Sequence, residues 1–190
     1  MKFLVLGIVV VSGITAWLWL DSSAGESIVI PKLKFPGANP AETQSAAAYT
    51  VPAFQGETYR NSRFGFSLAL PEGFRAQELP RDERGGVAIV LQDARGDGIQ
   101  IYVTPNVGDY TTLTAGDVRA AIPDMHVTDD MPVEIGEHNT GVAFMSDNDA
   151  FGGASREVWF YFGGNLFQIS TYAHLDELLK AMFGTWQFSV

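Results

Sequence analysis

The chain has 190 residues, no cysteine and a formal net charge of −10. This length allows one domain with an attached segment, and the absence of cysteine excludes disulfides and thiolate metal sites. The negative charge is concentrated between Asp109 and Asp149, where nine acidic residues accompany a single arginine. Such a field repels phosphate backbones, so nucleic acid is excluded as a favoured partner.

The first element along the chain is an apolar run without charges, from Phe3 to Leu20. As a helix with a rise of ~1.5 Å per residue it would span roughly 27 Å, close to the hydrocarbon thickness of a bilayer. We therefore expect a single-pass anchor with the N-terminus in the cytoplasm and the remainder outside, in the periplasm or extracellular space. The residues expected to lie in the membrane include Phe3, Leu6, Ile14, Trp17, Trp19 and Leu20.

A secretory signal peptide is the alternative interpretation of this run. Small residues follow it at Ser22, Ser23 and Ala24, so the protein would then be secreted after cleavage near Ala24. The run is longer than the usual apolar core of a signal, and its two tryptophans resemble the aromatic belt of a membrane interface. These two features favour the anchor.

Residues 21–56 are predicted to be a flexible tether between the anchor and a globular domain at 57–190. The tether contains four prolines. Each proline removes a backbone donor and biases the preceding residue toward extended conformations. The four prolines are Pro31, Pro36, Pro40 and Pro52. The predicted organisation is therefore an anchor or signal at 1–20, the tether and one domain.

Apolar periodicity predicts six or seven strands in this domain. Val158–Phe162 is apolar at every position, so both of its faces must be covered and it is expected near the centre of the sheet. Gly163-Gly164-Asn165 then turns the chain into an antiparallel partner. The expected strands lie at about 64–70, 87–91, 99–103, from 133, 142–145, 158–162 and 166–172.

Two helices are expected. Thr114 and Asp117 form a capping box that predicts a short helix closed by Pro123. A second helix near the C-terminus carries one apolar stripe, made of Leu175, Leu178, Leu179, Met182 and Phe183. The predicted fold is α+β, a mostly antiparallel sheet of six or seven strands covered by helices as an α/β/α sandwich. A closed eight-stranded β-barrel with a C-terminal helix is the alternative.

Three features together resemble a known family. The segment Tyr59–Phe74 has the form Y-x-N-x-x-F-G-F followed by P-x-G-aromatic, a late aromatic hairpin follows, and the last helix ends in Phe183–Phe188. Over about residues 58–188 this pattern resembles the PsbP/Mog1-like superfamily, including its exported bacterial members. The resemblance implies an antiparallel sheet between helical layers, and an accessory binding or assembly module, often of a membrane complex, rather than an enzyme. No functional residue of the family can be carried over.

Candidate metal ligands are few. His126, His138 and His174 have no helical zinc spacing. Oxygen ligands suit calcium, but an EF-hand loop that starts at Asp147 would have Phe151 at its fifth position, which excludes that loop type. The calcium candidates that remain are Asp147, Asp149, Asp129 and Asp130, with Glu134 nearby.

Motifs for catalysis and adhesion have simpler explanations. Gly65–Ala69 approaches a nucleophile elbow around Ser67, but it lies within a strand and ends in alanine. Arg95-Gly96-Asp97 is an RGD tripeptide that a hairpin turn explains, and Gly96–Gly98 lacks the third glycine of a dinucleotide loop. No catalytic residue and no cofactor is therefore expected.

These observations predict a membrane-tethered, extracytoplasmic, non-catalytic module that binds or assembles a protein complex of the membrane or envelope. The alternative is a small-ligand or calcium-binding protein, because the acidic segment and the aromatic-rich sheet are suited to line a pocket. A hydrolase is the third hypothesis, and it requires catalytic groups that are distant in sequence to meet in the fold.

Overall fold

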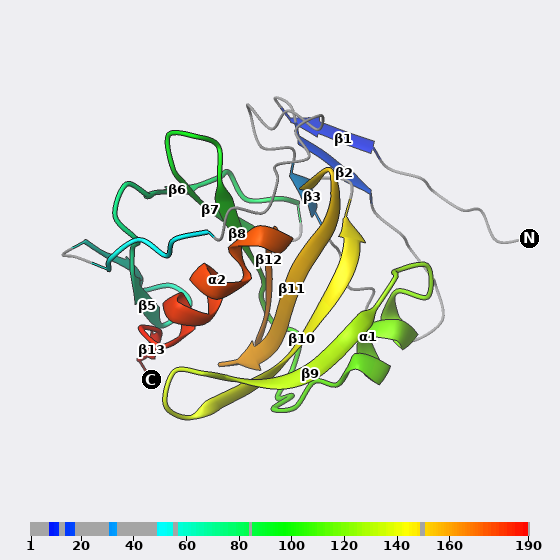
Figure 1. Cartoon of the computed structure of the whole chain (residues 1–190). Helices are drawn as coiled ribbons and strands as arrows, with labels where there is room; N and C mark the ends of the chain where they lie inside the picture. The colour runs from blue at the N-terminus through cyan, green and yellow to red at the C-terminus, as the bar shows by residue number, and fades with distance from the viewer. Residues whose placement is uncertain are drawn as a thin grey trace, which may run out of the picture.

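The protein is described here from a computed structural model (Figure 1). The described residues are 49–54, 57–83, 85–148 and 151–189, together with the backbone of 8–11, 14–17 and 31–33.

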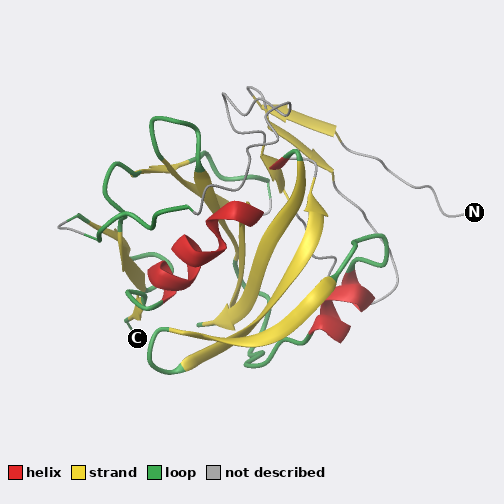
Figure 2. Cartoon of the chain, viewed as in Figure 1, coloured by secondary structure: helices red, strands yellow, loops and turns green. Residues whose placement is uncertain are grey.

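A seven-stranded antiparallel sheet forms the centre of the domain (Figures 1 and 2). Its strands, in spatial order, are β6 (Arg75–Glu78), β7 (Val87–Gln92), β8 (Gly98–Thr104), β12 (Asn165–Tyr172), β11 (Gly153–Phe162), β10 (Asn139–Asn148) and β9 (Thr128–Ile135). The sheet is open, with β6 and β9 at its edges, so the alternative of a closed barrel is wrong. Closure would require these two strands to pair with each other, whereas each pairs on one side only.

The remaining elements are short. A second antiparallel sheet has the order β13 (Gln187–Phe188), β5 (Phe66–Ala69) and β4 (Thr58–Asn61). The helices are α1 (Ala115–Ala121) and α2 (Asp176–Phe183), the latter preceded by the 3-10 turn η2 (Ala173–Leu175).

The main core lies between one face of the large sheet and the layer formed by α2 and the small sheet. Aromatic rings join these layers. Phe160 of β11 stacks on Phe167 of β12 at a centroid distance of 4.9 Å, and Phe66 of β5 stacks on Trp186 at 4.8 Å. All four rings are almost completely buried.

The opposite face is covered by α1 at one end. Val118 of α1 packs with Phe144 and Trp159, which alternate along β10 and β11 with the residues of the main core. The predicted α+β arrangement, with a mostly antiparallel sheet and helices on both faces, is therefore confirmed.

Local sequence signals explain both helices. Thr114 Oγ1 accepts a hydrogen bond from the Asp117 backbone N–H at 3.2 Å, and Asp117 Oδ2 accepts from the Thr114 backbone N–H at 2.8 Å. This is the predicted capping box, and it starts α1. The predicted apolar stripe of the last helix is buried over its whole length, as Leu175, Leu178, Leu179, Met182 and Phe183.

The strand predictions fail where a strand is exposed. β4 and β6 present polar residues to solvent, so they lack the alternation that reveals a half-buried strand. β9 begins at Thr128, five residues before the predicted start at Val133, because its first half is exposed. The strand predicted from Phe64 begins only at Phe66: Gly65 has φ +65°, and a Cβ there would lie 2.5 Å from the Ser189 carbonyl oxygen.

The N-terminal run differs from the expected helix where it is described. β1 (Ile8–Val11), β2 (Ile14–Trp17) and β3 (Pro31–Leu33) form a small antiparallel sheet. β-branched residues favour extended backbone, and both strands of the run are rich in them. The other membrane candidates, Phe3, Leu6, Trp19 and Leu20, lie outside the described residues.

No helix among the described residues is long and apolar enough to cross a membrane. The anchor, the alternative cleavage near Ala24 and the outward topology stay predictions. Within the expected tether, Tyr49, Val51 and Phe54 pack against the main core.

Candidate functional site

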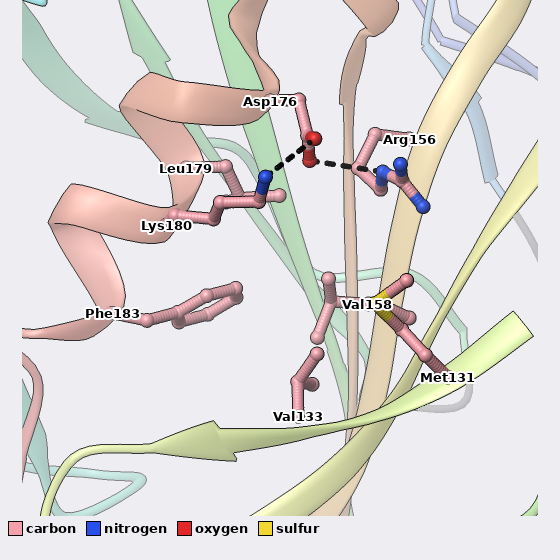
Figure 3. A pocket seen from close by; sticks show the side chains of 9 residues that line it. Met131, Val133, Arg156, Val158, Asp176, Leu179, Lys180 and Phe183 are labelled. Carbon is pink, nitrogen blue, oxygen red and sulfur yellow. Dashed lines mark ion pairs between the residues drawn. The ribbon is translucent and has the colours of Figure 1, made fainter.

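A groove opens on the α2 side of the large sheet, between α2 and strands β9, β10 and β11 (Figure 3). Its volume is about 60 Å³. Nine residues line it: Met131, Val133, Ala143, Arg156, Val158, Asp176, Leu179, Lys180 and Phe183.

Apolar side chains make up most of the lining. Ala143 and Val158 are buried at its base, and Leu179 and Phe183 form the α2 wall. Met131 belongs to the opposite wall and is 50% exposed. Met131 and Tyr110 are the two exposed large hydrophobic residues in the part of the chain that the structure describes. An exposed methionine at the edge of an apolar hollow is typical of adaptable binding surfaces.

One end of the groove is charged (Figure 3). Arg156 Nε lies 2.9 Å from Asp176 Oδ1, and Lys180 Nζ lies 3.0 Å from Asp176 Oδ2. Lys180 Nζ also lies 2.7 Å from Glu177 Oε1. Hydrogen bonds to Glu177 and Asp176 raise the pKa of Lys180, so its ammonium is held charged beside the apolar hollow.

A buried polar row lies on the opposite face of the same sheet. Glu157 of β11 is completely buried, and its Oε1 accepts a hydrogen bond from Ser155 Oγ at 2.7 Å. Its Oε2 accepts from Ser170 Oγ of β12, the residue directly across the strand pair. Next along the pair, Gln168 lies opposite Trp159, and both are buried. A buried carboxylate held by two hydroxyls is well satisfied, and it fixes the pairing of β11 with β12.

Among the described residues, no histidine pairs with a hydroxyl as in a catalytic dyad. His174 Nε2 lies 2.9 Å from Asp97 Oδ1, and its ring stacks on Tyr172 at 5.5 Å. His138 is exposed, with Glu137 3.8 Å away. His126 is exposed in the connection that follows α1.

The other motifs lie within secondary structure or turns. Ser67 is a β5 residue that pairs with Arg60 and Gln187 in the small sheet. In the RGD tripeptide, Arg95 Nε contacts Asp93 Oδ2 at 2.8 Å and Arg95 Nη2 lies 3.4 Å from Asp97, so these charges are engaged within the β7–β8 hairpin.

The calcium candidates that the structure describes, Asp129, Asp130 and Asp147, do not gather into a ligand set. Asp130 is paired with Arg119 at 2.7 Å. Asp129 is the second residue of β9 and has φ +50°, and Asp147 belongs to β10. Asp149 lies outside the described residues. Among those that are described, no three His, Asp or Glu side chains gather where they could hold a metal ion.

The groove could not be predicted from the sequence. Its residues come from β9, β10, β11 and α2, and only the α2 stripe gives a periodic signal. The polar row could not be predicted either, because Ser155, Arg156 and Glu157 are consecutive polar residues, and charged residues are mostly exposed.

Comparison with known proteins concerns the fold. No family model matches the chain, and no curated protein matches it. The solution structure of cyanobacterial PsbP (CyanoP) from Synechocystis sp. PCC 6803 is similar at 13% identity and a TM-score of 0.46, over 79% of this chain and 99% of that one. A crystal structure from Bacteroides thetaiotaomicron VPI-5482 is similar at 11% identity and a TM-score of 0.41, over 72% of this chain and 49% of that one.

The first of these structures is a PsbP protein, the kind of protein that the sequence pattern resembles. The chain spans about half the length of the second structure. Likenesses at this level of identity and TM-score say nothing of function.

Proposed function

We propose that this protein is a non-catalytic binding module that docks a protein partner in the groove between α2 and strands β9–β11. The observation that carries the proposal is the open apolar hollow, with half-exposed Met131 at its edge and the Arg156–Asp176–Lys180 charges at its end. Apolar surface surrounded by charged residues is the usual composition of a docking site.

The geometry favours this function over the alternatives. A hydrolase requires a nucleophile with a base within hydrogen-bond reach. His174 and His138 lie beside carboxylates. The hydroxyls of Ser155 and Ser170 do donate to the Glu157 carboxylate, but all three side chains are buried, so this pairing is closed to a substrate. A calcium protein requires a gathered set of oxygen ligands, and the described acidic residues do not supply one.

Attachment to a membrane, with the domain outside the cytoplasm, is the second part of the proposal. Its support is the length of the charge-free run Phe3–Leu20. Extraction of native membranes with alkaline carbonate tests it. We expect the full-length protein, intact from Met1, to stay with the membrane pellet. Release of a shorter protein that begins after Ala24 would show a cleaved signal instead.

Affinity capture of full-length protein from native membranes in mild detergent tests the docking function. Wild type, Met131→Lys and Tyr110→Lys are compared. The two variants are matched, because each replaces an exposed large hydrophobic residue by a charged one. Met131 lines the groove, whereas Tyr110 lies against Tyr161 on the opposite face of the sheet, with centroids 5.3 Å apart.

We expect a stoichiometric partner with wild type and Tyr110→Lys, and its loss with Met131→Lys, because a buried unpaired ammonium opposes association. A partner retained by Met131→Lys and lost by Tyr110→Lys would move the docking site to the other face and refute the proposal.

A further inference from the structure

The charged end of the groove holds a guanidinium whose hydrogen bonding is incomplete. The Arg156 side chain is 14% exposed, and its Nε lies 2.9 Å from Asp176 Oδ1 as an ion pair. The geometry of that contact does not make a hydrogen bond, and Nη1, also buried, has no hydrogen-bond partner. Buried donors without an acceptor are unfavourable, and they are satisfied when a bound group supplies one.

The neighbouring carboxylates do not satisfy all the hydrogen-bond donors of this guanidinium. Asp176 is shared, since its Oδ2 contacts Lys180 Nζ, and Glu177 contacts the same ammonium. Arg156 therefore shares its one carboxylate with Lys180. An arginine carries five N–H donors in a planar fork that matches the two oxygens of a carboxylate.

The edge strand that borders the groove is poorly suited to strand addition. β9 contains Pro132, which lacks a backbone N–H, and three acidic residues, Asp129, Asp130 and Glu134. Its pairing with β10 is also irregular between Ala143 and Met145. Proline, charges and bulges are the features by which sheet edges resist pairing with another chain. The occupant of the groove is therefore expected to use side chains rather than backbone hydrogen bonds.

The uncovered width beside α2 matches one helix. α2 packs against β12 and β5 and reaches β11 through the Arg156–Asp176 ion pair, whereas β9 is exposed along most of its length. Strands lie about 4.8 Å apart and packed helices about 8–10 Å apart, so one helix covers roughly two strands. A helix placed beside α2 would lie over β9 and β10, with the hollow beneath it.

We infer that the partner presents an amphipathic helix in this position, with an aliphatic side chain in the hollow and a carboxylate one turn away at Arg156. The inference rests on the proposed function and names the chemistry of the partner. Side chains three or four positions apart share a face of a helix, which matches a hollow with an adjacent guanidinium.

Designed peptides test this chemistry. The probes are fluorescent 16-residue helical peptides of alanine, lysine and glutamine that carry a stripe of leucines. They differ at one position, one turn before or one turn after the central leucine, which is either glutamate or glutamine. Titration into full-length protein, followed by fluorescence anisotropy, should show about tenfold tighter binding of a glutamate peptide, as expected for one charge-assisted hydrogen bond. Arg156→Gln should reduce this difference to below about twofold, and Met131→Lys should weaken both peptides.

Arg156→Lys is the second variant, because it keeps the charge but loses the planar fork. It should give an intermediate preference for glutamate, and urea unfolding of each variant establishes that the fold is kept. Equal affinity of the glutamate and glutamine peptides for wild type overturns the inference even if Met131→Lys weakens both. Failure of all peptides, while the native partner is lost with Met131→Lys, also overturns it and leaves the docking function in place. A native partner that is indifferent to Met131→Lys overturns the docking function itself.

Discussion

The two faces of the large sheet are both buried, but they are held by different forces. Toward α2 the strands contribute aromatic rings such as Phe160 and Phe167 and aliphatic side chains such as Ile169. This apolar layer ends in an open groove. On the other face an apolar cluster under α1 gives way to a polar row around Glu157. Apolar packing is non-directional and gives stability, whereas the carboxylate and its hydroxyls demand one geometry and so specify how the strands pair.

Removing a ring from the α2 face should have the largest effect on stability. Phe160 is completely buried and contacts Phe167, Trp186 and Phe188. Phe160→Ala should lower the free energy of unfolding by about 3–5 kcal/mol, from lost burial and the cavity that remains. Urea unfolding measures this. A loss below about 1 kcal/mol would mean that this face is not the main source of stability.

Removing the carboxylate should test the polar face. Glu157→Leu leaves the hydroxyls of Ser155 and Ser170 buried without their acceptor, so we expect a loss of roughly 2–4 kcal/mol in the free energy of unfolding.

The matched control removes the donors as well. Ser155→Ala and Ser170→Ala added to Glu157→Leu should restore part of the stability, because the two hydroxyl donors that lost their acceptor are then removed. A triple variant that is less stable than Glu157→Leu alone would show that the hydroxyls matter for another reason.

The stability of α1, the helix on the sheet face opposite α2, should depend on its N-terminal cap. Thr114→Ala removes the hydroxyl that accepts from the Asp117 backbone N–H, and about 1 kcal/mol of unfolding free energy should be lost. Thermal unfolding at neutral pH measures this change, and Ser at position 114 should preserve the cap.

The same cap predicts a dependence on pH. The hydrogen bonds from the Thr114 hydroxyl and backbone lower the pKa of Asp117 below its ordinary value of 3.8. The resulting stabilisation is present above 3.8 and is lost as the pH falls through the lowered pKa of the folded protein. Asp117→Asn should remove this contribution, so that its acid unfolding is less steep than that of wild type. Equal steepness would contradict the assignment.

The smallest effect on stability is expected in the groove. Met131 is half exposed, so Met131→Lys should change the free energy of unfolding by less than about 0.5 kcal/mol. A larger loss in urea unfolding would mean that Met131 supports the fold rather than a partner.

The elements that could be predicted from the sequence are those whose buried face produces a regular spacing of apolar residues along the chain. The apolar run 158–162 placed β11 near the centre of the sheet, and the stripe of α2 and the Thr114 box located both helices. Exposed strands such as β6 show no alternation of apolar and polar residues. The N-terminal run is apolar throughout, so its periodicity does not distinguish a strand from a helix. The groove and the polar row depend on which strands become neighbours, and single-sequence periodicity does not contain that information.

Site-specific photocrosslinking tests the docking claim most directly. The chain has no cysteine, so Met131→Cys and Tyr110→Cys each provide a single thiol for a benzophenone maleimide on full-length protein. The account predicts that irradiation in native membranes joins a partner protein to position 131 and not to position 110. A partner joined only at position 110, or no partner at either position, would contradict it.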